Sequence, residues 1–339
     1  KVVVAGRSKT GPNWDFSAAR YNANGSLDTS FGGDGKVTVS FGSNDDYGQS
    51  AAVQTDGKLV IAGQATILGS ADFAIARLDS NGVPDASFDG DGQVTTDFGG
   101  TTDLAFGAVV QTDGKIIVVG YTDAGGGGIN HALARYNADG SLDSTFGVGG
   151  KVIADFGGSD DYVGGVALQD DGKLVVAGAK STAGNYDVAV TRYNADGTLD
   201  TSFGTGGSVV TDLGSTTEVA VSVDIDNFGK IVVAGSISTG FNFDTAVLRY
   251  NSDGTLDSGF GNLGTQVVAV SRSDDFGNSI AIQPDNNVVV AGMAVGAGTF
   301  DKSLIRLVGG VPVIPNSEFS IVPTDSDKFE GNPGTTTPF

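Results

Sequence analysis

The sequence of 339 residues contains no cysteine, which excludes disulfides, thiolate catalysis and cysteine-ligated metals. His131 is the only histidine, so a metal site built from several histidines is excluded and a His-based catalytic triad is not favoured. We expect His131 to be an ordinary surface or strand residue. It takes the place of Phe16, Phe73 and Phe243 in the repeat described below.

Glutamate is scarce in a strongly acidic chain. Of 40 acidic residues, only Glu218, Glu318 and Glu330 are glutamate. Solvated helices favour Glu, whereas Asp and Asn are typical of turns and of oxygen-rich cation sites. The 54 glycines also require many turns. The composition therefore predicts β structure rather than helices.

Long basic runs and long apolar runs are both absent. The formal net charge is −21, which repels nucleic acid and anionic membranes. No apolar stretch approaches the roughly 18 residues of a membrane-spanning helix. We therefore expect neither a nucleic-acid partner nor insertion into a membrane.

An arginine recurs at a nearly fixed interval of 57 or 58 residues. The arginines concerned are Arg20, Arg77, Arg135, Arg192, Arg249 and Arg306. One unit, residues 48–99, has no helical period and contains four β-like segments, at 49–54, 58–63, 72–78 and 93–99. Four antiparallel strands per unit, repeated about six times, predict an all-β fold, a six-bladed β-propeller with a 57-residue blade period. A β-solenoid is the alternative, although its rungs are usually shorter and its strands parallel.

Two longer motifs carry a resemblance to known repeats. The pattern "VAVxxDGKxxVAG", followed by a strand ending in "DxDG", resembles the four-stranded blades of NHL-type propellers. The pattern "DFAVARYNADGSLDTSFGxGGKV…DDxxxAVQxDGKxxVAG" resembles the delta-60 bacterial repeat family over residues 1–308. That resemblance implies a multi-domain protein that is secreted or exposed at the cell surface, and it implies no particular activity.

The ends of the repeat are uneven. "AVQ"-type inner strands and "GKV"-type outer strands occur five times each, but "VVVAG"-type strands occur six times, at 2–6, 59–63, 116–120, 174–178, 231–235 and 288–292. We therefore expect a propeller over 1–308 with incomplete first and last blades, and a linker over 309–317. Incomplete blades leave unpaired edges.

The last residues have two interpretations. "EFSIVPTDSDKFEGNPGTTTPF", residues 318–339, resembles the start of a Calx-beta domain, which implies a truncated domain with Glu330 as a calcium ligand. Alternatively, "EFSIV" closes the outer edge of blade six or pairs with a neighbouring molecule, which would make a homo-oligomer. "VPVIP", residues 311–315, contains two prolines and suits only an edge position.

A phrase such as "NADGSLDSTFG" follows the repeated arginine in nearly every blade. Its spacing of oxygen-bearing side chains partly matches calcium loops. The same residues also suit a structural turn, in which Asn or Asp caps its own backbone and Gly takes a positive φ. Both interpretations stay open, and the calcium candidates are Asn137, Asp139, Asp143, Asn194, Asp196, Asp200, Asn251, Asp253 and Asp257. The arginines are expected to pair with fourth-strand acids such as Asp97, Asp155 and Asp212.

The repeated turns are expected on one face of the propeller, here called the bottom face. The connections between second and third strands and those between blades are expected on the opposite face, here called the top face, and they vary between blades. Variable loops on a rigid scaffold usually carry binding sites. Aromatic residues there suit stacking on sugars or contact with a protein, and paired acids lie near the channel mouth together with Asp103 and Glu218. The ligand-binding candidates are Trp14, Tyr121, Tyr186, Phe241, Asp45, Asp46, Asp160, Asp161, Asp274 and Asp275.

Three functions fit this sequence. The first is a non-enzymatic extracellular binding or scaffold module for protein or carbohydrate, with calcium as a possible stabiliser. The second is a metal-dependent hydrolase or lactonase with a cation in the channel, which would need one asymmetric carboxylate cluster. The third is a subunit that self-assembles by strand donation. Acids that recur blade by blade favour the first.

Overall fold

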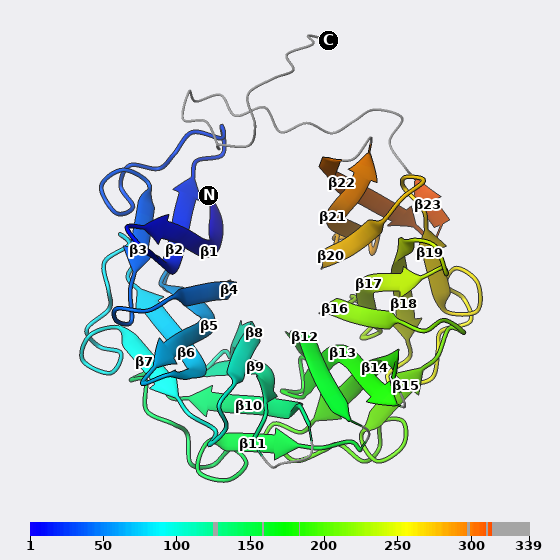
Figure 1. Ribbon diagram of the computed structural model, residues 1–339, viewed down its shortest axis with the longest axis horizontal. Helices are drawn as coiled ribbons and strands as arrows, with labels where there is room; N and C mark the ends of the chain where they lie inside the picture. Colours follow the sequence, from blue (N-terminus) through cyan, green and yellow to red (C-terminus); the bar gives the residue numbers. More distant parts are fainter. Residues whose placement is uncertain (125–127, 158, 183, 297–298, 310, 314–339) are drawn as a thin grey trace.

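A computed structural model shows six β-sheets arranged around a central axis (Figure 1). The structure describes residues 1–124, 128–157, 159–182, 184–296, 299–309 and 311–313. All regular elements in these ranges are strands. None of the described residues belongs to a helix that could cross a membrane. The chain therefore folds as the all-β propeller expected from the repeat, with six blades.

Each sheet, or blade, takes its strands from consecutive stretches of chain. The first blade contains β1 (Val2–Thr10), β2 (Asn13–Tyr21) and β3 (Lys36–Val39). The second contains β4 (Asp46–Val53), β5 (Leu59–Ile67), β6 (Ser70–Leu78) and β7 (Gln93–Thr96), and the third contains β8 (Asp103–Val110), β9 (Ile116–Thr122), β10 (Asn130–Tyr136) and β11 (Lys151–Ala154). The fourth contains β12 (Asp160–Leu168), β13 (Leu174–Thr182), β14 (Asn185–Tyr193) and β15 (Ser208–Thr211). The fifth contains β16 (Glu218–Ile225), β17 (Ile231–Ser238), β18 (Phe243–Tyr250) and β19 (Thr265–Val268), and the sixth contains β20 (Asp275–Ile282), β21 (Val288–Gly296), β22 (Thr299–Val308) and β23 (Val311–Val313).

Neighbouring strands within every blade are antiparallel. The solenoid alternative, with its parallel rungs, is therefore wrong. Figure 1 shows the blades following one another around the axis, with a break in the ring between the first and the sixth.

The core lies between blades. In blades two to five the second and third strands are largely buried on both faces, as in β5 and β6, because neighbouring blades cover them from both sides, whereas β22 of blade six is buried on one face only. Val60 and Phe73 of the second blade, for example, belong to the same buried cluster as Val118 and Ala134 of the third. This is why these strands read as nearly continuous apolar runs, whereas inner strands such as β12 alternate.

Every complete inner strand carries a one-residue bulge at the same place, for example between Val163 and Gly165 of β12. The extra residue of each bulge, for example Phe106 or Asn278, lines a central cavity of about 330 Å³ between the inner strands. The bulge also explains the glycine of the "VAG" motif, because a Cβ on Gly178 would lie 1.8 Å from the carbonyl oxygen of Tyr162.

Residues 311–313 pair with β22 as the outer strand of blade six, with Val311 opposite Val308 and Val313 opposite Arg306. The linker expected over 309–317 therefore contains a short strand, and the proline-rich segment does take an edge position. The first blade has three strands, as the uneven repeat predicted. "EFSIV", Glu330 and the Calx-beta resemblance lie outside the described residues.

His131 is a buried strand residue of β10. Its Nδ1 lies 3.2 Å from the hydroxyl oxygen of Tyr193. By strand register it matches Phe16 and Phe73, but the match to Phe243 is wrong, and the equivalent residue of blade five is Thr245. Phe243 lies six residues before its repeated arginine instead of four, so residue type misled the alignment.

Candidate functional site

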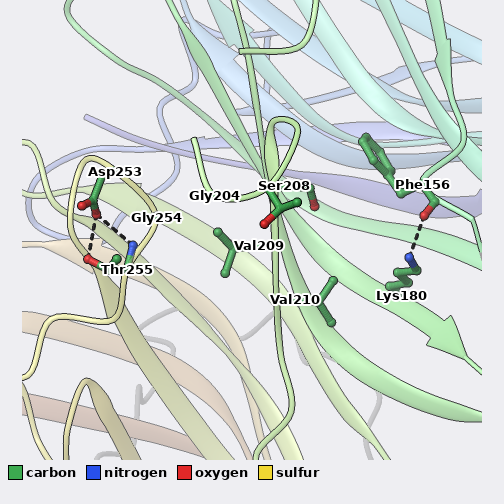
Figure 2. A pocket seen from close by; sticks show the side chains of 10 residues that line it. Phe156, Lys180, Gly204, Ser208, Val209, Val210, Asp253, Gly254 and Thr255 are labelled. Atoms are coloured by element: carbon green, nitrogen blue, oxygen red, sulfur yellow. Dashed lines mark hydrogen bonds between the residues drawn. The ribbon is translucent and has the colours of Figure 1, made fainter. Parts of the chain in front are cut away.

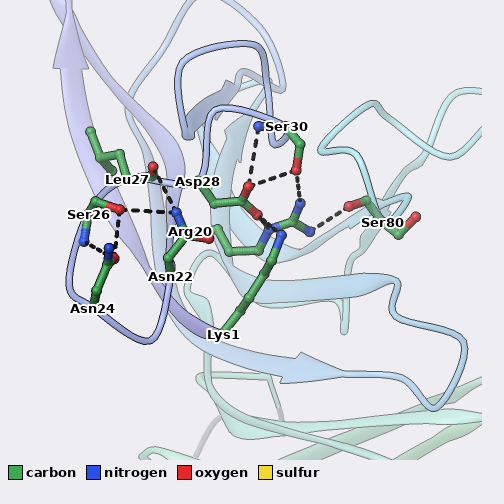
Figure 3. A network of polar contacts seen from close by, with 9 residues as sticks. All are labelled: Lys1, Arg20, Asn22, Asn24, Ser26, Leu27, Asp28, Ser30 and Ser80. Atoms are coloured by element: carbon green, nitrogen blue, oxygen red, sulfur yellow. Dashed lines mark hydrogen bonds and ion pairs between the residues drawn. The ribbon is translucent and has the colours of Figure 1, made fainter.

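The turns on the bottom face are held by their own side chains. In blade one, shown in Figure 3, Asn22 Nδ2 donates to Ser26 Oγ at 3.1 Å, and Asn24 Oδ1 accepts from Ser26 Oγ at 2.8 Å. Asp28 Oδ2 accepts from Arg20 Nε at 2.6 Å. The turn therefore uses its Asn and Asp oxygens to fix its own backbone and the repeated arginine.

The residues predicted as calcium ligands have the same contacts. Asp139 Oδ1 accepts from Ser141 Oγ at 2.6 Å, and Asp143 Oδ2 accepts from Arg135 Nε at 2.8 Å. Burial acts to raise the pKa of Asp143, but hydrogen bonds from Thr145 and the charge of Arg135 lower it to about 2. Equivalent turns are formed by Asn194, Asp196 and Asp200 and by Asn251, Asp253 and Asp257. These bonds favour the structural-turn interpretation, because the oxygens already have donors.

The repeated arginine pairs with the last acid of this turn. Arg77 Nε lies 2.8 Å from Asp85 Oδ2, and its guanidinium covers the Phe88 ring at 4.5 Å. Arg77 Nη1 also donates to the carbonyl of Ala138 in the next blade at 2.6 Å. The prediction of structural pairing is correct, but the predicted partners Asp97, Asp155 and Asp212 are wrong. Third and fourth strands run in opposite directions, so these acids lie at the top ends of the fourth strands, away from the arginines.

A depression of about 680 Å³ beside β15 lies between the two faces (Figure 2). Its polar groups bond to the protein itself: Lys180 Nζ donates to the Phe156 carbonyl at 2.6 Å, and Thr255 Oγ1 donates to Asp253 Oδ1 at 2.7 Å. Nothing in its described lining brings reactive groups together, so it is not a strong candidate.

The paired acids of the top face divide into two structural roles. The first member of each pair accepts a backbone N–H from the preceding blade, as Asp160 Oδ1 does from Ile129 at 3.1 Å. Asp45 Oδ1 accepts from Trp14 N at 2.9 Å, and Asp274 Oδ1 accepts from Phe243 N at 3.0 Å. These acids tie the connection between two blades to a third strand.

The second member begins the inner strand and is buried. Asp46, Asp161 and Asp275 are at most 3% exposed, and none of them is among the described residues that line the central cavity. Their Oδ2 atoms accept backbone N–H groups five residues earlier in the chain, at 2.7 or 2.8 Å. Burial raises the pKa of Asp46 and of Asp161.

Two junctions assemble three carboxylates each. Oxygens of Asp72, Asp97 and Asp103 lie within 4.8 Å of one another, and so do oxygens of Asp187, Asp212 and Glu218. We call these sets the first and second triads. Burial raises the pKa of Asp103, and the charges of Asp97 and Asp72 add to the rise. Four of the six acids were named from the sequence, but they were not grouped into sites. Asp72 and Asp187 were missed. Both lie five residues before the repeated arginine, and this fixed spacing is the signal that could have identified them.

A row of aromatic rings crosses the top of blades three and four. Phe106 stacks on Tyr121 with ring centroids 5.2 Å apart, Tyr121 meets the edge of Tyr162 at 5.5 Å, and Tyr162 lies 5.8 Å from Tyr186. All four side chains are half-buried. Phe106 also lines the central cavity, so this aromatic row runs outward from the axis to the start of β14.

Two of these rings, Tyr121 and Tyr186, were predicted from the variable loops, and two were missed. Phe106 and Tyr162 follow the inner-strand acids Asp103 and Asp161, and the signals were "LAFG" and "DDYVG". Burial, with the nearby charge of Asp160, raises the pKa of Tyr162 to about 12, so its hydroxyl stays neutral.

The other predicted aromatics lie elsewhere on the top face. Trp14 is half-buried, and the Arg7 guanidinium lies 5.5 Å from its ring and 4.7 Å from that of Tyr47. Phe241 is 99% exposed. Neither of them contacts the aromatic row within the described residues.

The central cavity has a neutral lining. Its described side chains are amide, hydroxyl and apolar, with Gln49, Ser222 and Asn278 among the polar ones. No carboxylate lines the described part of this cavity. The triads and the aromatic row are thus the two unusual features of the top face.

Five stretches of the chain match the family model described as "Domain of unknown function (DUF5122) beta-propeller", at residues 1–31, 54–88, 111–146, 169–203 and 229–260. Each stretch contains one bottom turn, and the blades are those of the fold above. The chain is a β-propeller repeat protein. No curated protein matches this propeller.

Several solved structures resemble this propeller at low sequence identity. A protein of unknown function from Bacteroides caccae is 12% identical with a TM-score of 0.52, over 91% of this chain and 92% of that one. A streptogramin B lyase is 11% identical with a TM-score of 0.49, over 88% and 81% of the two chains. A gluconolactonase from Xanthomonas campestris is 15% identical with a TM-score of 0.40, over 83% and 82%. At these identities the likeness concerns the fold alone.

Proposed function

We propose that this propeller is a non-enzymatic binding and scaffold module of a larger secreted or surface protein, and that its partner contacts the top face. The partner class is a polysaccharide or a protein of the cell surface. The observation that supports this proposal is the aromatic row, four half-buried rings from two blades in continuous contact.

The row has the chemistry of a recognition surface. Tyrosine combines a large apolar ring with a polar hydroxyl, loses little conformational entropy on binding, and is enriched at interfaces. Here each ring is held by the next, so a ligand meets a preorganised surface. Asp160 lies close enough to raise the pKa of Tyr162 and offers a hydrogen-bond acceptor for sugar hydroxyls or peptide N–H groups.

The hydrolase alternative requires reactive groups in the channel. A catalytic cation is usually held with the help of carboxylates, and the described lining of the central cavity holds amides, hydroxyls and apolar groups but no carboxylate. We therefore favour binding over catalysis. The resemblance of the repeats to delta-60 bacterial repeats supports the extracellular placement.

Binding to an array of bacterial and plant polysaccharides and purified surface proteins tests this proposal. We expect the intact chain to bind at least one member, and Tyr162→Ala with Tyr186→Ala to weaken that binding at least tenfold. Interfaces commonly lose more than 1 kcal/mol per truncated central aromatic, which is about fivefold or more each.

Phe228→Ala is the matched control, because Phe228 is 76% exposed in the turn between β16 and β17, on the opposite face. It should bind as the unaltered chain does. If no array member binds, or if the double variant binds unchanged, the top face is not the recognition surface.

A further inference from the structure

The two triads have the same construction in different blades. In each, one acid is the third residue of the third strand of a blade, one follows the fourth strand of that blade, and one begins the inner strand of the next blade. The first triad thus joins blades two and three through Asp72, Asp97 and Asp103. The second joins blades four and five in the same way.

One carboxylate oxygen at the centre of each triad lacks a partner. Asp103 and Glu218 are both 0% exposed. Asp103 Oδ2 accepts from Phe98 N at 2.7 Å, and Glu218 Oε1 accepts from Ser215 N at 2.7 Å. The other oxygens, Asp103 Oδ1 and Glu218 Oε2, have no hydrogen bond of normal geometry within the described structure, and the only side chain that approaches the Asp103 carboxylate as a donor is that of Thr122. Buried polar groups are nearly always paired, and a buried charge without compensation is costly.

The intervening junction, between blades three and four, shows how the chain compensates such a charge. Asn130 replaces the third-strand acid there, and Lys180 stands opposite Asp161 in the β12–β13 pair. Its ammonium donates to the Phe156 carbonyl at 2.6 Å (Figure 2). The charge of Lys180 also acts to lower the pKa of Asp161. This junction therefore has two acids and a covalently attached cation.

Neither triad has a lysine opposite its inner-strand acid. The residues at the place of Lys180 are Thr122 in the first triad and Ile237 in the second. Asp161 and Asp275 also have an unpartnered Oδ1, so the inward-facing oxygen is a feature of the repeat. Within the described residues, only the two triads gather three acids around it. Lys151 approaches the first triad from its edge, where its Nζ donates to the Asp97 backbone carbonyl at 3.0 Å.

We propose that each triad binds a divalent cation of the calcium class, which links two adjacent blades at the top face. Carboxylate oxygens within 4.8 Å of one another can share an ion with metal–oxygen distances of 2.3–2.6 Å, as calcium has. The described ligands are all oxygens, which favours calcium over zinc. Calcium sites in extracellular modules bind with dissociation constants of about 10⁻⁴–10⁻³ M, and we expect affinities in this range.

Calcium titration of the full chain, after treatment with a chelator, tests the proposal by calorimetry and by thermal melting. We expect two sites and a melting temperature that rises with calcium. Asp97→Asn and Asp212→Asn are the main variants, since both residues are exposed and each Asn keeps the acceptor for its backbone N–H bond. Each should lose one of the two sites, and the double variant should lose both.

Asp155→Asn is the matched control. Asp155 occupies the same place in the Lys180 junction and makes the same backbone bond, to Gly157 N at 2.6 Å. It should keep both sites. The proposal is overturned if the unaltered chain neither binds calcium nor melts higher with it, if the double variant keeps two sites, or if Asp155→Asn loses as much binding as Asp97→Asn. If calcium is bound by the bottom turns instead, the double variant will keep two sites.

Discussion

At the scale of single residues, repetition separates structural side chains from variable ones. Arg77, Asp85 and Phe88 form one unit that recurs in other blades, with Arg192, for example, 2.7 Å from Asp200. Such a buried, multiply bonded pair fixes the turn and reaches the next blade. His131, by contrast, occurs once, in a place that blades one and two fill with Phe16 and Phe73.

His131→Phe tests the burial of that residue. Burial lowers the pKa of His131 to about 4, against a smaller opposing contribution from the Tyr162 backbone. The usual value is near 6.5, so between pH 6.5 and 4 the unfolded chain binds a proton that the folded chain does not. The resulting stability is fully present above pH 6.5 and is lost as the pH falls toward 4, by roughly 3 kcal/mol in total.

We therefore expect the unaltered chain to lose stability relative to His131→Phe over this window, in urea unfolding at pH 7.5, 6, 5 and 4.5. The difference between the two curves cancels the contributions of the carboxylates that both chains share. Parallel stability curves would mean that His131 is accessible to protons in the folded state.

At the scale of elements, the positions of strands could be predicted from the sequence wherever a local hydrophobic pattern determines them. Apolar alternation and the recurring "DG" turns located the second and third strands, and β5 and β6 contain both predicted segments. Pairing across blades could not be predicted in the same way. The partner of Arg77 depends on which strand ends share a face, and the triads join Asp72, Asp97 and Asp103 from two different blades. Sequence distance carries no information on such contacts until the strand order is known.

The outer strand of blade six provides an element-scale prediction. A chain ending at Val308 loses β23, and a chain ending at Val313 keeps it. A three-residue ladder contributes two or three backbone hydrogen bonds, roughly 1–3 kcal/mol net. The shorter chain should melt lower and should associate more in sedimentation, because the edge of β22 becomes available for pairing.

Both chains lack residues 314–339, so the comparison isolates β23 from the rest of the tail. Identical melting and sedimentation would show that β23 contributes nothing to the sheet.

At the scale of the whole molecule, the two faces have different tasks. The bottom face repeats one turn whose side chains bond to their own blade and the next, and the N–H of Gly204 donates to the carbonyl of Asp253 in the same manner. The top face carries the features that differ between blades: the aromatic row over blades three and four, and the two triads on either side of the Lys180 junction. The residues that repeat in each blade hold the propeller together. The residues that differ between blades lie on the top face, where we propose that the partner binds.

Hydrogen–deuterium exchange with and without a polysaccharide or protein that the array identifies is the most direct test of that placement. We expect slower exchange at the top ends of β8, β9, β12 and β14, around Phe106, Tyr121, Tyr162 and Tyr186. Exchange in the bottom turns, residues 137–146 and 194–203, should not change. Protection confined to the bottom turns or to the outer strands would show that the partner does not bind at the top face.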